Sequence, residues 1–209
     1  MKTFDVQVRG SGIVGSAAAL ALSRRGLSVA MTPAAAVREE DVRAYALNAA
    51  SVALLDSLKV WSALPADART AVYDMRVQGD DSAAEILRFS AWQQQVRELA
   101  WIVDAAALEA ELTSALRYAP HVERTAEPVQ AALQVVAEGK ASATREQFGV
   151  AFETHDYGQR AIAARLGTTE PHQGMALCVN PAREIASEMN LVFVVKRSGV
   201  LPPKTSGQK

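Results

Sequence analysis

The sequence predicts an α/β fold built on a parallel β-sheet, and three features of the first 31 residues support this. Residues 4–8 alternate between apolar and polar side chains, as a short strand does. A glycine-rich turn at residues 10–15 leads into an Ala- and Leu-rich helix at residues 16–25, which Gly26 is expected to end. Residues 27–31 form a second apolar strand. The segment is therefore a predicted βαβ unit, whose parallel strands are buried on both faces.

The chain beyond this unit continues to mix helices and strands. Residues 33–41, rich in Ala, Pro and charged residues, are predicted to form a loop, and residues 48–58 an amphipathic helix. Two strands at residues 71–77 and 86–90 are expected to be joined by a polar turn at residues 79–82.

The later helices and strands follow the same reasoning. The strongest helix signal lies at residues 104–116, where Leu108, Leu112 and Leu116 form an i, i+4 stripe. Weaker signals predict a strand at 131–136, a helix at 143–147, a strand at 161–166 and a divergent, frayed tail at 179–209.

Composition excludes several classes of protein. The 209 residues hold 22 Lys and Arg against 23 Asp and Glu, so the charge of −1 argues against a nucleic-acid-binding surface. The only cysteine, Cys178, excludes an internal disulfide, and the three histidines lack metal-ligand spacing, so no metal site is predicted. No apolar stretch approaches about 20 residues. A cytoplasmic protein is expected, with peripheral contact to the inner membrane if its substrate is amphiphilic.

Gly10, Ser11, Gly12, Ile13, Val14 and Gly15 together match the pattern G-x-G-x-x-G between a strand and a helix. In a dinucleotide site the first glycine permits the tight turn, and the second lets the backbone approach a pyrophosphate. The third lets the helix pack closely on the strand. The alternative is a purely structural turn.

One partner of that motif is missing. A dinucleotide site normally has Asp or Glu at the end of the second strand to bind the ribose hydroxyls. Here that strand ends at Thr32 and Pro33, and Thr32 offers one hydrogen bond only. The acidic residues at 39–41 are expected to form a solvated loop.

In several sequence blocks that follow in order, the chain resembles the ubiquinone-biosynthesis type of FAD-dependent aromatic hydroxylases over residues 4–176. Residues 137–145 (AEGKASATR) are similar to that family's second cofactor fingerprint, D-G-x-x-S-x-x-R. The other similar blocks are residues 10–15, 41–48 (DVRAYALN), 58–61 (LKVW), 100–104 (AWIVD) with Leu108 and Leu112, 157–159 (YGQ), 161–163 (AIA) and Pro171-His172.

The resemblance implies a Rossmann-like FAD-binding domain of the glutathione-reductase type with a partial β-rich substrate layer. Residues 1–178 would form this domain, including a partial substrate-domain insertion at roughly 71–103 and 150–178. It also implies FAD as cofactor, NADPH or NADH as reductant, and hydroxylation with O₂ of a small aromatic substrate, with or without a polyprenyl chain.

Site roles follow from the resemblance. Arg43 would approach the cofactor phosphate or ribityl chain, and the alternative is a surface ion pair with its acidic neighbours. Glu138 and Gly139 would lie near the pyrophosphate and the nicotinamide path, and Arg145 would tether that loop. No catalytic residue is identified.

The chain departs from the family's pattern in three places. Glu138 stands where Asp is usual, the stretch between Leu112 and Ala137 is shorter than in the family, and the later G-D-A-A-H-x-x-x-P motif is absent. We therefore expect the N-terminal half of such a hydroxylase. The alternatives are a non-catalytic accessory protein, or a half-enzyme completed by a partner chain at an apolar edge near residues 191–195. A homo-oligomer is a further expectation.

Other chemistry-bearing residues are weaker candidates. His172 as a general base has no partner visible in the sequence, and Cys178 as a nucleophile has no nearby group that would activate it. A His155–Asp156 dyad is weak because neighbours on a strand point to opposite faces. The three tryptophans, Trp61, Trp92 and Trp101, are expected in the core rather than around a flavin.

Overall fold

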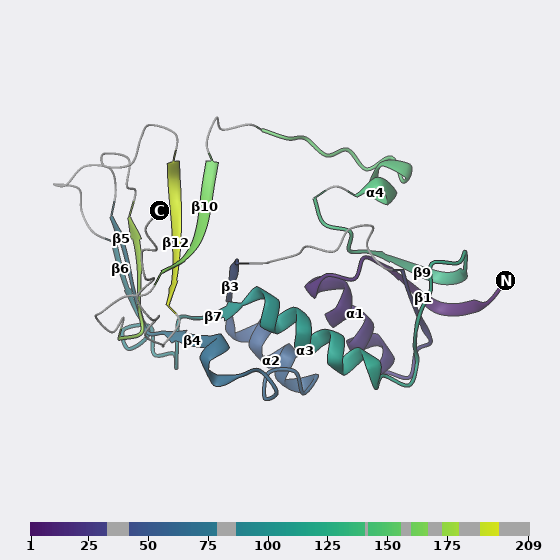
Figure 1. Cartoon of the computed structure of the whole chain (residues 1–209), viewed down its shortest axis with the longest axis horizontal. Coiled ribbons are helices and arrows are strands. Elements are labelled where there is room, and N and C mark those ends of the chain that lie inside the picture. Colours follow the sequence, from purple (N-terminus) through teal and green to yellow (C-terminus); the bar gives the residue numbers. More distant parts are fainter. Residues whose placement is uncertain are drawn as a thin grey trace, which may run out of the picture. The chain divides into compact units, whose positions relative to one another are not determined.

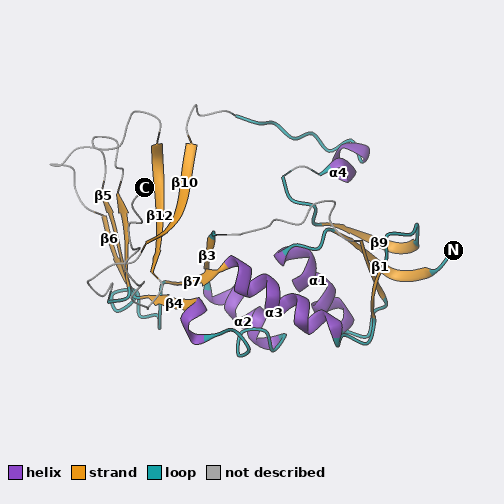
Figure 2. Ribbon diagram, viewed as in Figure 1, coloured by secondary structure: helices purple, strands orange, loops and turns teal. Residues whose placement is uncertain are grey.

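The computed structural model describes residues 1–32, 42–78, 87–140, 142–155, 160–166, 173–179 and 189–196. These residues belong to two compact units. The first draws on 1–41, 49–64 and 105–156, and the second on 42–48, 65–104 and 157–209. The α-helices of the described residues all belong to the first unit, whereas the second consists of strands and a short 3-10 helix (Figure 2).

A four-stranded parallel sheet organises the first unit. Its order is β8-β2-β1-β9, and every neighbouring pair runs parallel. Its strands are β1 (Thr3–Arg9), β2 (Val29–Thr32), β8 (Val122–Arg124) and β9 (Gln130–Val136). Because β1 lies between β2 and β9, its carboxyl end opens at the middle of one sheet edge.

The described helices of this unit are α1 (Ile13–Ser23), α2 (Ala49–Ser57), α3 (Ala105–Arg117) and α4 (Ala143–Gln147). One of them, α1, contacts β1, β2 and β8 of the sheet. Helix α1 connects β1 to β2 and packs against α3, and the two helices lie side by side in Figure 1. The core holds Val8 and Val29 from the sheet and the predicted Leu108, Leu112 and Leu116 stripe from α3, all buried. This apolar burial is the main stabilising contribution to the unit.

The second unit contains three small sheets. One is antiparallel, with the order β3-β7-β4, and another has the order β11-β5-β6. The third pairs β10 with β12 in parallel. The elements are β3 (Ala44–Leu47), η1 (Ala66–Ala68), β4 (Arg69–Val72), β5 (Asp74–Gln78), β6 (Leu87–Ser90), β7 (Ala100–Asp104), β10 (Arg160–Leu166), β11 (Met175–Val179) and β12 (Met189–Lys196).

The structure confirms the βαβ unit and the helices predicted near residues 16–25, 48–58, 104–116 and 143–147. The single strand predicted at 71–77 is wrong, because β4 and β5 belong to different sheets and part at Tyr73. The amide of Tyr73 donates to the carbonyl of Gly174, and its own carbonyl accepts from Ala91. Side-chain alternation carries no information on such a change of sheet.

Four further expectations have different outcomes. Trp92 was expected in the core, and this is wrong, since it is 89% exposed at the surface. The loop at 33–41 and the turn at 79–82 lie outside the described residues. Part of the tail beyond residue 179 forms strand β12.

Among the residues that the structure describes, no helix is long and apolar enough to span a membrane.

Candidate functional site

The glycine-rich loop joins the carboxyl end of β1 to the first turn of α1. Ligands of open parallel α/β sheets bind outside the carboxyl ends of the strands, so this is the edge where a cofactor is expected. Gly12 is the N-cap of α1, and no side chain caps that helix. No acidic residue lies in its first turn, so the positive end of the helix dipole faces outward uncompensated by a local carboxylate.

Gly10 and Gly15 are required by close backbone approach. A Cβ on Gly10 would lie 2.3 Å from the carbonyl oxygen of Ala137, and Gly10 has φ = 107°, a conformation that favours glycine. A Cβ on Gly15 would lie 2.0 Å from the carbonyl oxygen of Gly10. These two positions therefore bring strand, loop and helix together, as the first and third glycines of the motif were predicted to do.

Among the residues that the structure describes, none packs against Gly12. A Cβ built there meets none of their atoms within 4 Å, and its φ of −72° is open to any residue. Its side-chain position therefore opens onto free space at the positive end of α1, where a pyrophosphate would approach. This pattern of two packed glycines and one open glycine fits a dinucleotide.

The other residues of the loop complete its surface. The carbonyl of Ser11 accepts a hydrogen bond from Ser16 Oγ at 3.1 Å, and Ser16 N donates to the carbonyl of Gly12 at 2.9 Å. Ile13 is half-buried, whereas Val14 is 71% exposed in the first turn of α1. Val14 therefore supplies apolar surface beside the open glycine.

The second fingerprint loop follows β9 and touches the first. The amide of Ala137 donates to the carbonyl of Arg9 at 2.7 Å, which brings residues 137–139 beside Gly10. The carboxylate of Glu138 accepts hydrogen bonds from Ser142 Oγ at 2.7 Å, Thr144 Oγ1 at 2.7 Å and Thr144 N at 3.1 Å. Both of its oxygens therefore have partners from the start of α4.

These hydrogen bonds also set the charge state of Glu138. The hydroxyl of Thr144 is the largest influence and holds the pKa of Glu138 below its usual range. Burial opposes this as the second-largest influence on the pKa, and Ser142, the amide of Thr144 and the charge of Arg9 each add a smaller lowering effect. Glu138 is therefore a carboxylate across the neutral range.

Gly139 and Arg145 complete this loop. Gly139 has φ = 77°, and a Cβ there would meet open space, so its backbone is accessible beside the first loop. Arg145 Nη2 donates to the carbonyl of Lys140 at 2.9 Å, and its guanidinium lies 3.9 Å from the centre of the Phe152 ring. As expected, Arg145 tethers the loop.

The ribose side of the site has no carboxylate on the described residues of β2. The hydroxyl of Thr32, the last residue of β2, accepts a hydrogen bond from Gln7 Nε2 at 3.3 Å. Gln7 is buried on β1, so Thr32 is tied to the sheet. The acidic residues 39–41, weighed as a substitute, lie outside the described residues.

Arg43 lies in the second unit, directly before β3, and is half-buried. Its guanidinium is 5.7 Å from the centre of the ring of Tyr45 in β3, a cation–π contact between near neighbours in the chain. Its assignment to the cofactor phosphate or ribityl chain stays a prediction, as do the roles of the two fingerprint loops in binding.

The weaker candidates gain no support. His155 is exposed, Asp156 and His172 lie outside the described residues, and of Cys178 only the backbone in β11 is described. Among the residues that the structure describes, no group of three His, Cys, Asp or Glu is arranged to hold a metal ion.

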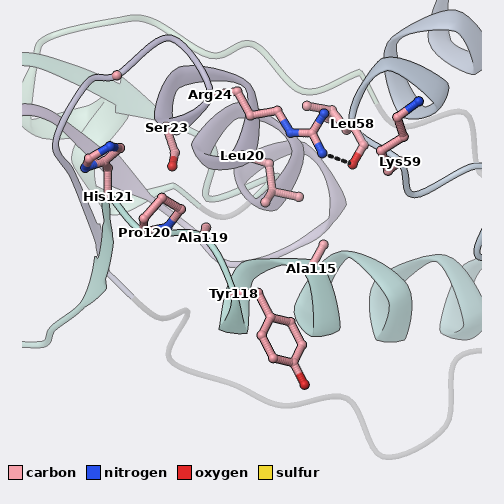
Figure 3. A pocket seen from close by; sticks show the side chains of 11 residues that line it. Leu20, Ser23, Arg24, Leu58, Lys59, Ala115, Tyr118, Ala119, Pro120 and His121 are labelled. Atoms are coloured by element: carbon pink, nitrogen blue, oxygen red, sulfur yellow. Dashed lines mark hydrogen bonds between the residues drawn. The ribbon is translucent and has the colours of Figure 1, made fainter.

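A pocket of about 540 Å³ lies elsewhere in the first unit. Figure 3 shows it between the carboxyl ends of α1 and α3 and the residues after α2. Arg24 closes one side, with Nη2 donating to the carbonyl of Leu58 at 2.9 Å, and His121 lies directly before β8. Because α1 begins at the glycine-rich loop and ends here, this pocket is at the opposite sheet edge and is not the cofactor site.

Two residues that contact the second loop, Arg9 and Thr144, were not identified as site residues from the sequence. Arg9 precedes Gly10 at the end of β1, and its Nη1 donates to Thr144 Oγ1 at 3.3 Å. Thr144 is one of the variable positions of the fingerprint. No spacing connects residues 135 apart in the chain, so only the tertiary structure reveals this contact.

Comparisons with known proteins agree with this geometry. Residues 3–96 match the family described as FAD binding domain. The chain is 27% identical to ubiquinone hydroxylase UbiL of Rhodospirillum rubrum, over 84% of this chain and 46% of that protein. It is 28% identical to 3-demethoxyubiquinol 3-hydroxylase of Escherichia coli, over 76% of this chain and 47% of that protein.

Solved structures support the same fold. The FAD-dependent monooxygenase PqsL of Pseudomonas aeruginosa aligns with a TM-score of 0.63 at 18% identity, covering 75% of this chain and 48% of that one. The p-nitrophenol 4-monooxygenase PnpA of Pseudomonas putida aligns with a TM-score of 0.61 at 18% identity, covering 76% and 47%. The chain spans about half the length of the relatives it matches.

Proposed function

We propose that this chain, a partial member of the ubiquinone hydroxylase family of FAD-dependent monooxygenases, binds FAD at its two fingerprint loops and takes part in hydroxylation of an aromatic ring. The observation that carries the proposal is the contrast within one loop. Gly10 and Gly15 are packed against backbone, whereas Gly12 faces open space at the start of α1. A purely structural turn would not need glycine at position 12.

Each loop residue has a physical task in this proposal. Gly12 leaves room for the pyrophosphate, and the first turn of α1 offers its amides and dipole to that anion. Val14 presents apolar surface beside it, and Gly139 presents open backbone on the second loop. When bound, FAD supplies the redox chemistry with NADPH or NADH and O₂. The protein binds and orients the cofactor.

The substrate class is proposed from the relatives. Two curated relatives carry names that state ubiquinone or demethoxyubiquinol hydroxylation, which supports a small aromatic substrate with a polyprenyl chain. Such an amphiphilic substrate is the reason to propose peripheral membrane contact.

The visible absorption spectrum of the purified chain tests this proposal directly. After incubation with FAD and gel filtration, we expect flavin bands to co-elute with the protein. NADPH and NADH oxidation by the yellow protein, with and without ubiquinol-type phenols, then tests reductant and substrate. A protein that stays colourless in excess FAD contradicts the proposal.

A second candidate is a half-enzyme that needs a partner chain, and one observation favours it. Leu133 and Val136 on β9 are 54% and 37% exposed, at the outer strand of the described parallel sheet. Exposed apolar side chains on an edge strand suit pairing with further polypeptide. In this case the isolated chain stays colourless and gains flavin only with its partner.

A further inference from the structure

We infer that Arg9 and Thr144 are positioning residues of the cofactor site, which hold Glu138 and the adjoining Gly139 against the glycine-rich loop through a hydrogen-bond relay. This inference rests on the proposed function, because it concerns the same site. It assigns Glu138 an internal role in place of direct contact with the pyrophosphate.

The relay has two links that share one hydroxyl group. Arg9 Nη1 donates to Thr144 Oγ1 at 3.3 Å, and Thr144 Oγ1 donates to Glu138 Oε1 at 2.7 Å. A threonine hydroxyl has one proton and two lone pairs, so it accepts from the guanidinium and donates to the carboxylate at once. Thr144 is 3% exposed, so water does not replace either link at low cost.

Capping of α4 does not need Arg9. Ser142 is the N-cap of α4, and its Oγ accepts from the amide of Arg145 at 3.1 Å. Glu138 adds a bond to the amide of Thr144. Arg9 comes from β1, a different element, and its Nε is buried without a hydrogen-bond partner among the described residues. Burying a guanidinium in this way is costly unless a nearby anion compensates it, and Glu138 is that anion.

The position of Glu138 matters because the two loops are in contact. A Cβ on Gly10 would lie 3.0 Å from the amide nitrogen of Glu138 and 2.3 Å from the carbonyl oxygen of Ala137. Residues 137–139 therefore form one wall of the glycine-rich loop. Releasing Glu138 frees that wall to move, and a displacement of about 1 Å is enough to disturb a binding site.

The charged groups on the elements around Glu138 are Arg9 on β1, Lys140 in the loop, and Arg145 and Glu146 on α4. Of these, Arg9 is the one whose charge lowers the pKa of Glu138. The relay is therefore electrostatic as well as geometric. Removing the charge of Arg9 is expected to raise the pKa of Glu138 toward its ordinary value.

Matched substitutions in the full chain test the relay by flavin fluorescence titration. Thr144→Val keeps the shape and removes the hydroxyl, and we expect FAD affinity to fall about tenfold, the effect of losing hydrogen bonds to charged groups. Thr144→Ser keeps the hydroxyl and should bind within about threefold of wild type. Arg9→Gln should resemble Thr144→Val. Thr113→Val on α3 and the exposed Arg25→Gln serve as controls and should leave affinity unchanged.

The pH dependence of FAD affinity separates positioning from packing. The bonds to Glu138 are present above its folded pKa and are lost as pH falls through it. The FAD affinity of wild type should therefore hold down to about pH 4.5 and fall below it, and we call this fall the acid limb. Arg9→Gln should move the acid limb to higher pH, and Glu138→Gln should bind FAD weakly at every pH, with no acid limb. A packing role alone would lower Tm and leave the limb in place.

Failure of the relay and failure of the proposed function give different results. Wild-type affinity and an unmoved acid limb in both Arg9→Gln and Thr144→Val would overturn the relay, whatever the activity of the chain. If wild type binds no FAD, the proposed function fails, and the relay is then tested in the chain without FAD. The ¹³C-detected pKa of the Glu138 carboxyl should then rise in both variants, and an unchanged pKa overturns the inference.

Discussion

Gly12 and Gly15 lie three residues apart in one loop, yet an added methyl group meets different surroundings at each. At Gly15 it would lie 2.0 Å from the carbonyl oxygen of Gly10, whereas at Gly12 no atom of the described residues is within 4 Å. Gly15 therefore serves the packing of the protein, whereas Gly12 leaves room for a group that would approach from outside. Two glycines of one motif are thus needed for different physical reasons.

This contrast predicts opposite effects of two identical substitutions. Gly15→Ala should lower the free energy of unfolding by about 3 kcal/mol, because the clash is with backbone that has little room to move. Gly12→Ala should change stability by less than about 0.5 kcal/mol but weaken FAD binding at least about tenfold. Urea unfolding and flavin fluorescence measure the two effects. Equal losses of stability in the two variants would contradict this division.

At the scale of elements, a polar contact joins the neighbouring strands β1 and β2. The carboxylate of Asp5 accepts from Ser28 N at 2.8 Å and Ser28 Oγ at 2.7 Å, and Ser28 Oγ accepts from Asp5 N at 3.0 Å. The hydroxyl of Ser28 and then its amide hold the pKa of Asp5 below its ordinary value of 3.8. Ser28 directly precedes β2, so the contact helps to set its register against β1.

We predict that Ser28→Ala destabilises the chain in a pH-dependent way. Since the folded pKa of Asp5 is depressed, its contribution is present above pH 3.8 and is lost as pH falls through the folded value. The urea midpoints of wild type and variant should therefore differ at pH 7 and converge below pH 3.8. Ser57→Ala is the control, because Ser57 Oγ donates to the carbonyl of Leu54 and its loss should not depend on pH.

At the scale of the whole molecule, stability depends on the core of the first unit. Leu112 of α3 is fully buried, and the buried side chains of β1 and β2 belong to the same core. Leu54 of α2 is the same residue type but 46% exposed. Burial, rather than hydrophobic identity, decides what each contributes.

Leu112→Ala should therefore lower the free energy of unfolding by about 2–5 kcal/mol, through lost burial and a remaining cavity. This is a large part of the about 5–15 kcal/mol typical of a domain. Leu54→Ala should cost less than about 1 kcal/mol. Urea unfolding followed by circular dichroism compares the two, and a similar loss in both would show that α3 does not anchor this core.

The elements that the sequence predicted well are those with strong local signals. The strand–loop–helix unit at the N-terminus combines alternation with a glycine pattern, and the Leu108, Leu112 and Leu116 stripe of α3 repeats with the helical period. Strands β8 and β3 are short and escaped prediction. The change of sheet at Tyr73 escaped as well, because strands of different sheets show the same alternation.

By itself, then, the sequence determined the parallel α/β class, the position of the glycine-rich loop and the resemblance of these blocks to FAD-dependent aromatic hydroxylases. Each of these depends on residues close together in the chain. Only the tertiary structure decided what surrounds each residue. It packs Gly15 against backbone and leaves Gly12 open, and it links Glu138 through Thr144 to Arg9. Such contacts arise from packing of elements that are distant in sequence, and no local pattern encodes them.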